Sequence, residues 1–95
     1  MKVVWTNEAL NHLDSIYHYF VKDNPYYAKR VVDNLTARTK QLHRFPESGR
    51  LVPEYEAEAL RELIESPYRI IYYVIDKQVE ILAVFHGAQQ LPNDL

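Results

Sequence analysis

The first half of the chain carries apolar residues at steps of three and four, the spacing of one helix face. A short β-rich run from Lys2 to Trp5 precedes this pattern, and Thr6 after it is a candidate helix N-cap. These signals predict a strand followed by a helix that begins near Asn7. The apolar face of that helix consists of Ala9, Leu10, Leu13, Ile16, Tyr17, Phe20 and Val21.

A second helix is predicted directly after Asn24-Pro25, because asparagine caps helices and proline suits the first helical position. It ends near Phe45, since Pro46 cannot continue a helix. The connection between the helices is short, which predicts an antiparallel hairpin. The apolar face of the second helix consists of Ala28, Val31, Val32, Leu35, Leu42 and Phe45.

The second half of the chain changes to strand-forming residues. Residues 46–57 are expected to form a turn and then a polar connection, and residues 60–65 to form a short strand closed by Ser66-Pro67. Residues 68–75 and 79–85 are dense in β-branched and aromatic side chains, so they are expected to pair as a hairpin.

The order of strand, two helices and three strands predicts an α+β fold. The expected architecture is an antiparallel two-helix hairpin packed on one face of a mainly antiparallel sheet, in a single domain covering residues 1–95. The chain has no cysteine, and no apolar stretch approaches the length needed to span a bilayer. A soluble cytoplasmic protein without a disulfide scaffold or a thiolate metal site is therefore expected. No metal site of another kind and no cofactor are expected either.

Charge is unevenly distributed along the chain, although the net charge is only −2. Residues 29–50 hold six basic and two acidic residues, a balance of +4, and residues 51–80 hold three basic and seven acidic residues, a balance of −4. Two solvated faces of opposite sign and a binding polarity both account for this pattern.

Arg69 is the charged residue that the strand pattern does not explain. Alternation along residues 68–75 makes both faces of that strand apolar, with Arg69 at its start. Burying an unpartnered guanidinium costs several kcal/mol. Arg69 is therefore expected to pair with Glu65 or Glu80, or to lie over Tyr73; the alternative is a contact with an anion or phosphate.

His86 ends the last predicted strand and is a candidate general base or acid, because imidazole titrates near pH 7. A lone histidine at a strand end is more often structural, and no nucleophile or phosphate-binding motif accompanies it. Its expected strand face also holds Glu80, Leu82 and Val84. The remaining histidines lack ligand-like spacing and are expected to face solvent: His12, His18 and His43.

Several short fragments recur together in one known group of proteins. They are Trp5-Thr6 before Ala9, Leu13, Ile16 and Tyr19; Asn24-Pro25 and Ala28; Phe45-Pro46 before Gly49-Arg50; Arg61-Glu62; Pro67 to Tyr72; and Val84 before His86-Gly87-Ala88. In this order and spacing, and over nearly the whole chain, they resemble the RelE/ParE superfamily of toxins from bacterial type II toxin-antitoxin systems, which include plasmid stabilisation systems.

The resemblance implies the fold described above and a cognate antitoxin as partner. Antitoxin tails in this superfamily are often acidic and amphipathic, which gives the basic residues 29–50 a purpose. The resemblance also implies that operator DNA is bound only through the antitoxin and that no membrane is involved. The expected antitoxin contacts are Lys29, Arg38, Lys40 and Arg44.

Two activities occur in this superfamily, and the fold does not choose between them. RelE-like toxins cut ribosome-bound mRNA without a metal, in which case Arg69 and His86 are the implied catalytic residues, with charge from Arg50 or Arg61. ParE-like toxins inhibit DNA gyrase and are not nucleases. The acidic balance of residues 51–80 and the sequence His-Gly-Ala favour the ParE-like branch.

One departure from the family concerns the segment after His-Gly-Ala. Relatives commonly carry an arginine there, whereas this chain has Gln89 and Gln90. The group that the arginine contacts in those relatives would here contact a neutral amide. An attenuated toxin or a non-toxic interaction domain is therefore a further alternative. The expected target or phosphate contacts are Arg50, Arg61, Arg69, Gln89 and Gln90.

Overall fold

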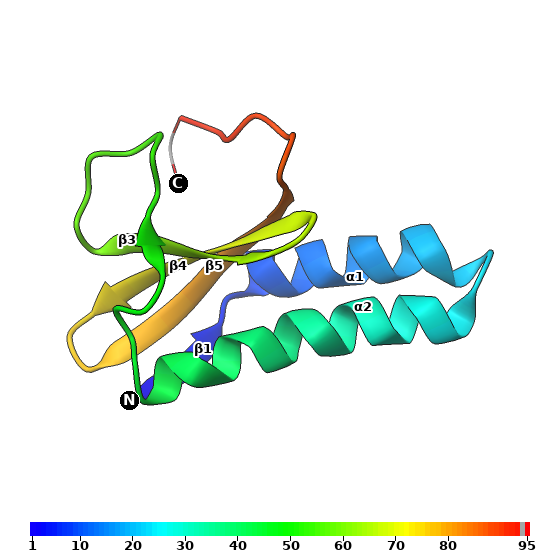
Figure 1. Cartoon of the computed structure of the whole chain (residues 1–95), viewed down its shortest axis with the longest axis horizontal. Coiled ribbons are helices and arrows are strands. Elements are labelled where there is room, and N and C mark those ends of the chain that lie inside the picture. Colours follow the sequence, from blue (N-terminus) through cyan, green and yellow to red (C-terminus); the bar gives the residue numbers. More distant parts are fainter. Residues whose placement is uncertain (94) are drawn as a thin grey trace.

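The computed structural model describes residues 1–93 and residue 95. The elements in chain order are β1 (Lys2–Trp5), α1 (Asn7–Val21), α2 (Pro25–Arg38), the 3-10 helix η1 (Thr39–His43), β2 (Arg50–Leu51), β3 (Leu60–Glu65), β4 (Tyr68–Ile75) and β5 (Gln78–His86). In the described part of the chain, five strands form one sheet in the order β1-β5-β4-β3-β2. β1 runs parallel to β5, and the other neighbours are antiparallel. Figure 1 shows α1 and α2 side by side against the sheet, so the predicted α+β architecture is confirmed.

Both helices begin where the sequence predicts. The Thr6 hydroxyl accepts a hydrogen bond from the backbone N–H of Ala9 at 3.2 Å, and the Asn24 side chain accepts one from Tyr27 at 3.0 Å. The second helix is shorter than predicted, because α2 ends at Arg38 and narrows into η1. There the Thr39 hydroxyl donates to the carbonyl of Thr36 at 2.8 Å, a local bond that competes with regular helix geometry.

The main core lies between the helices and the sheet. Its buried residues are Ala9, Leu13, Leu35, Leu42, Leu63, Ile70, Tyr72, Val79, Ile81 and Val84. Two residues predicted on the apolar helix faces, Leu10 and Phe45, are exposed instead. Leu10 lies beside the buried row of Ala9 and Leu13, and Phe45 lies beyond η1, where helical spacing no longer sets its direction.

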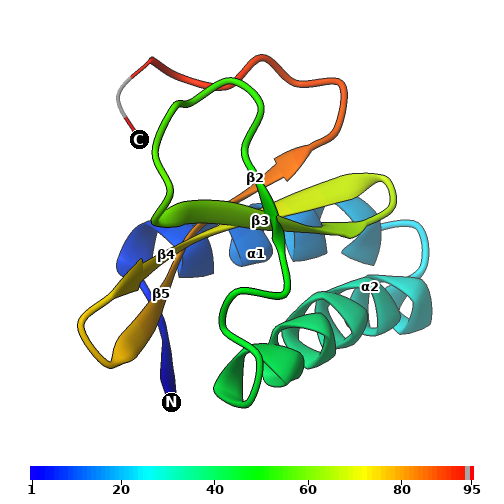
Figure 2. The same ribbon diagram turned by 60° about the vertical axis from the view of Figure 1, so that its left-hand side comes forward.

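The opposite face of the sheet carries a second core, as the apolar residues on both faces of the central strand predict. Its buried members are Val52, Leu60, Ile71, Ala83, Phe85 and Leu91. Figure 2 shows what covers this face: the loop between β2 and β3, and the segment after β5. β2 was not predicted, since residues 50 and 51 read as polar connection, but Arg50 pairs with Glu62 and Leu51 with Arg61.

An irregularity between β4 and β5 changes which face the end of β5 presents. Tyr72 pairs with Ile81 and Ile71 with Ala83, so Leu82 is an extra residue. His86 therefore shares the helix face with Val84, and its predicted grouping with Glu80 and Leu82 is wrong.

His12 also departs from its prediction. Its side chain is half-buried rather than solvent-facing, because Nδ1 accepts a hydrogen bond from the backbone N–H of Val84 at 3.0 Å. Its ring lies 5.2 Å from that of Phe85. His18 and His43 are exposed, as predicted.

Candidate functional site

Arg69 and Glu62 form a buried ion pair on the sheet face away from the helices. In the β3–β4 register Ile64 lies opposite Arg69, so Glu62 is the diagonal neighbour of Arg69 on the same face. Arg69 Nε donates to Glu62 Oε1 at 2.6 Å. The Arg69 side chain is 9% exposed and that of Glu62 is 0% exposed. Each charge compensates the other, which lowers the cost of burying both.

Glu54 reaches the same arginine from the loop between β2 and β3. Its two carboxylate oxygens accept hydrogen bonds from Arg69 Nη1 and Nη2 at 2.7 and 2.8 Å, a bidentate arrangement. Hydrogen bonding from Arg69 lowers the pKa of Glu54 to about 2, and the hydrogen bonds that Arg69 donates to both glutamates raise the pKa of Arg69. All three guanidinium nitrogens of Arg69 therefore already hold a carboxylate.

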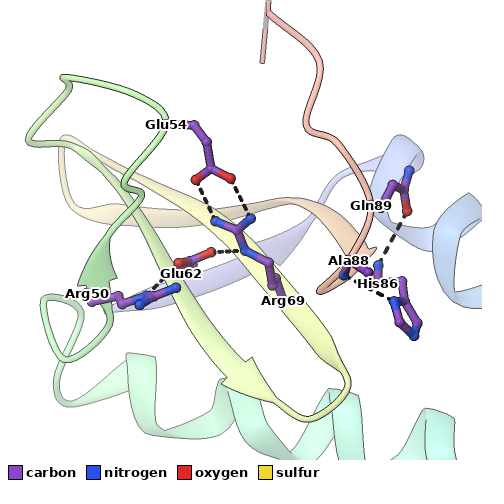
Figure 3. Close-up of polar contacts among 7 residues, drawn as sticks. All are labelled: Arg50, Glu54, Glu62, Arg69, His86, Ala88 and Gln89. Atoms are coloured by element: carbon purple, nitrogen blue, oxygen red, sulfur yellow. Dashed lines mark hydrogen bonds and ion pairs between the residues drawn. The ribbon is translucent and has the colours of Figure 1, made fainter.

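Arg50 completes a row of alternating charges. Its Nε donates to Glu62 Oε2 at 2.6 Å, while its side chain stays 58% exposed. Figure 3 shows the resulting row, which we call the ion chain: Arg50, Glu62, Arg69 and Glu54. Its two positive and two negative charges balance, so the site presents less positive charge than its two arginines suggest.

The turn before β2 holds the ion chain in place. The backbone N–H of Gly49 donates to the Tyr72 hydroxyl at 2.9 Å, and burial raises the pKa of that hydroxyl. A β-carbon at Gly49 would lie 2.6 Å from both the Glu62 carbonyl oxygen and the Tyr72 hydroxyl, so this close approach requires glycine. Arg61 supports the turn by donating to the carbonyl of Gly49 at 2.9 Å, and it is thereby engaged within the fold.

The predicted partners of Arg69 were wrong in identity. Glu65 lies on the helix face, where it is 3.6 Å from Arg38, and Glu80 lies opposite Tyr73 near the other end of β4. Glu62 was within reach of sequence reasoning, because the turn at Ser66-Pro67 fixes the β3–β4 register. Glu54 was not, since it lies in an irregular loop where no spacing rule places a side chain.

His86 is separated from Arg69 by the sheet. His86 pairs with Tyr68 and Arg69 with Phe85, so the register directs His86 and Arg69 to opposite faces. The exposed imidazole accepts a hydrogen bond from the backbone N–H of Ala88 at 3.2 Å, and the backbone N–H of His86 donates to Gln89 Oε1 at 3.4 Å (Figure 3). These two bonds fix the turn that follows β5.

His86 lines a groove of about 460 Å³ below the end of α1. The other lining residues are Ser15, Ile16, Tyr19, Phe20, Pro67 and Tyr68. The Tyr68 and His86 rings meet edge-on with their centroids 5.9 Å apart. The lining of this groove is aromatic and largely uncharged. It therefore suits contact with an apolar side chain better than contact with a phosphate.

A second cavity, of about 290 Å³, adjoins the ion chain. Arg50, Glu54 and Arg69 contribute its charged walls, and Pro67 and Gly87 lie beside them. An anion entering this cavity meets the outer side of the Arg69 guanidinium, which Glu54 occupies. Phosphate contact by Arg69 thus requires that Glu54 first leave.

The predicted antitoxin contacts lie along α2, η1 and the residues just after them. Lys29 is exposed but pairs with Asp33 one turn later, and Lys40 is exposed. Arg38 ties α2 to the sheet, because its Nε donates to the carbonyl of Ile64 at 3.3 Å. The Arg44 guanidinium lies 5.8 Å from the centre of the Phe45 ring.

Within residues 1–93 and 95, no three histidine, aspartate or glutamate side chains are grouped as metal ligands. Over the same residues, the helices are too short or too polar to cross a bilayer.

Comparison with known sequences gives matches over nearly the full length. A family described as "ParE toxin of type II toxin-antitoxin system, parDE" matches residues 3–91. The putative toxin Y4kP of Sinorhizobium fredii is 41% identical over 96 residues, which cover 99% of this chain and 96% of the relative. Toxin RelE2 of Caulobacter vibrioides is 38% identical over 89 residues, which cover 93% of this chain and 97% of the relative.

Solved structures with a similar fold include two toxin-antitoxin systems. A chain of the chromosomal ParDE system from P. aeruginosa superposes with a TM-score of 0.77 at 28% identity, covering 90% of this chain and 95% of that chain. A chain of the RelBE2 complex from Mycobacterium tuberculosis superposes with a TM-score of 0.56 at 22% identity and the same coverage, which supports the fold alone.

Proposed function

The chain belongs to the ParE family of toxins from type II toxin-antitoxin systems, and on that premise we propose that it arrests growth by binding DNA gyrase and is neutralised by a cognate antitoxin. The ParDE system among the similar structures supports an antitoxin partner. Both the target and the partner are expected in the cytoplasm.

The separation of Arg69 from His86 is the observation that favours gyrase inhibition over RNA cleavage. Metal-free RNA cleavage needs a base, an acid and a cation that converge on one phosphate. Here the candidate cation is held by two glutamates, and the candidate base lies on the other face of the sheet. This arrangement supports a toxin that acts by binding a protein.

The basic surface of the second helix supports the proposed antitoxin contact. Lys29 and Lys40 are exposed there, and Arg44 follows η1. The Lys29 pair with Asp33 is itself exposed, so an acidic side chain of a partner can replace Asp33 at little cost. Arg38 is the weakest of the predicted contacts, because it already binds β3 and Glu65. No operator contact is proposed for the toxin itself.

A substitution at His86 tests the proposal with little effect on the core, because His86 is exposed and, within the described residues, its ring hydrogen-bonds only to Ala88, in the turn after β5. Arg69→Ala is unsuitable, since it leaves the buried Glu62 carboxylate with only the exposed Arg50. Wild type, His86→Ala and the matched surface variant His18→Ala are induced without antitoxin, and mRNA cleavage is mapped by primer extension. Background cleavage in all three is expected. The proposal is contradicted if wild type and His18→Ala cleave mRNA and His86→Ala does not.

Ribosome-dependent mRNA cleavage is the second candidate, favoured by the 38% identity to a relative named Toxin RelE2. In that case Glu54 must leave Arg69 before RNA binds. A third candidate is an attenuated toxin, favoured by the exposed amides of Gln89 and Gln90 at the place where the family resemblance implies a cation. Raised toxicity of Gln90→Arg in the same induction experiment supports attenuation; unchanged toxicity contradicts it.

A further inference from the structure

We propose that Arg50 and Arg69 form a carboxylate-binding site, that Glu54 occupies it in the isolated toxin, and that an acidic side chain of a protein partner displaces Glu54 there. The inference deepens the proposed function by naming how a partner is held, and it rests on that function only in requiring a protein partner. It does not depend on gyrase being the target.

The two glutamates of the ion chain differ in a way that makes one permanent and the other exchangeable. Glu62 lies within β3, is fully buried and accepts hydrogen bonds from two arginines. Glu54 lies in an irregular loop, its side chain is 44% exposed, and it contacts Arg69 alone within the ion chain. The Glu54 carboxylate can return to water when its contact opens, whereas both partners of the contact between Glu62 and Arg69 are buried, so the Glu54 contact is the easier of the two to open.

The loop between β2 and β3 also carries a polar group, the Tyr55 hydroxyl, that would gain hydrogen bonds to water if the loop opened. Within the described residues, the Tyr55 hydroxyl is buried and has no hydrogen-bond partner. Opening the loop exposes that hydroxyl to water, which offsets part of the lost Glu54 contact. Tyr55 directly follows Glu54, so one movement releases both.

The geometry that remains after Glu54 leaves is suited to one carboxylate. Two Arg69 nitrogens point together at the position of the Glu54 oxygens, which is the fork that binds carboxylates and phosphates in bidentate fashion. The adjoining cavity of about 290 Å³ has Arg50 on one side and Ile64, Pro67 and Tyr68 on another. Apolar walls around a cationic fork fit an acidic side chain flanked by apolar residues.

Charge around the site favours a protein over RNA as the source of the anion. Residues 51–80 have a balance of −4, and Glu56 and Glu58 are exposed in the same loop as Glu54. A strand of phosphates is repelled by these charges along its length, whereas a single carboxylate meets mainly the two guanidiniums.

Peptide titration of the purified protein tests the site directly. The probe is the capped tripeptide acetyl-Leu-Glu-Leu-amide, with its glutamine twin and inorganic phosphate as separate arms. Binding is followed by NMR from the side-chain Nε–H signals of Arg50 and Arg69. The variants are Glu54→Gln, which removes the competing carboxylate, and Glu56→Gln, which removes an exposed charge from the same loop.

The expected result is that Glu54→Gln binds the glutamate peptide about three- to tenfold more tightly than wild type, while Glu56→Gln does not. The glutamine peptide is expected not to bind, and phosphate to bind more weakly than the glutamate peptide. Equal peptide affinity in wild type and Glu54→Gln overturns the competition. Tighter binding of phosphate than of peptide overturns the protein carboxylate as occupant. Either result leaves gyrase inhibition, which is measured separately, untouched.

Discussion

Arg69 and His86 lie near the same end of two paired strands but on opposite faces of the sheet. Tyr68 faces His86 across the pair, and Arg69 faces Phe85. The extra residue Leu82 in β5 is the cause, because it exchanges the faces of all later positions in that strand. The two candidate catalytic residues of the RelE-like alternative are therefore kept apart by backbone geometry.

Glu62→Gln is expected to destabilise the protein by about 3 kcal/mol, since it removes the charge that compensates the buried Arg69. The free energy of unfolding from urea denaturation measures the effect. Glu58→Gln, at an exposed loop position, is the control and is expected to change stability by less than about 0.5 kcal/mol. Similar values for the two variants contradict a structural role for the buried carboxylate.

Glu54 is expected to contribute a pH-dependent part of the stability. Its pKa falls from 4.5 to about 2 on folding because Arg69 donates hydrogen bonds to the carboxylate. A lowered folded-state pKa stabilises the fold above pH 4.5, and this contribution is lost as the pH falls from 4.5 towards 2.

The measurement is the difference in unfolding free energy between wild type and Glu54→Gln at several pH values. Because Glu54 is partly exposed, the difference at pH 7 is expected not to exceed about 1 kcal/mol. It should shrink below pH 4.5. A difference that stays constant down to pH 2.5 rules out a lowered Glu54 pKa as its source.

Gly49→Ala is expected to destabilise the protein by about 2 kcal/mol, because the new methyl group would lie 2.6 Å from backbone and tyrosine oxygens. Gly87→Ala is the matched control, since a β-carbon there would lie 3.1 Å from the Pro67 carbonyl oxygen. Thermal unfolding should rank Gly49→Ala well below Gly87→Ala, and the reverse order contradicts the close approach of the turn to β3 and β4.

His12→Ala is expected to cost about 1 to 2 kcal/mol, because it removes the acceptor for the Val84 backbone N–H between α1 and β5. His18→Ala is the comparison on the same helix, where the ring bonds only within α1 and is exposed. Urea denaturation of both variants decides the point. Equal stabilities show that the contact between α1 and β5 does not depend on His12.

The helices and strands could be predicted from the sequence wherever a few neighbouring residues determine them. Thr6 and Asn24 announce helix starts by their own side-chain chemistry, and residues 60–65 and 68–75 have the predicted strand bounds. The density of β-branched and aromatic residues was enough to predict two apolar sheet faces.

The features that the sequence did not predict depend on contacts between distant residues. The His12 bond to Val84 joins positions 72 apart, and the Glu54 bond to Arg69 depends on the path of an irregular loop. The extra residue Leu82 leaves no mark in the apolar pattern of β5, because both faces of that strand are apolar. Candidate sites that need two strands in register are therefore the hardest to predict from sequence.

The most direct test of the central claim compares gyrase supercoiling and ribosome-dependent mRNA cleavage with the same purified, antitoxin-free protein. The account predicts that the protein inhibits supercoiling in proportion to its concentration and leaves ribosome-bound mRNA intact. Cleavage of ribosome-bound mRNA with supercoiling unaffected contradicts it.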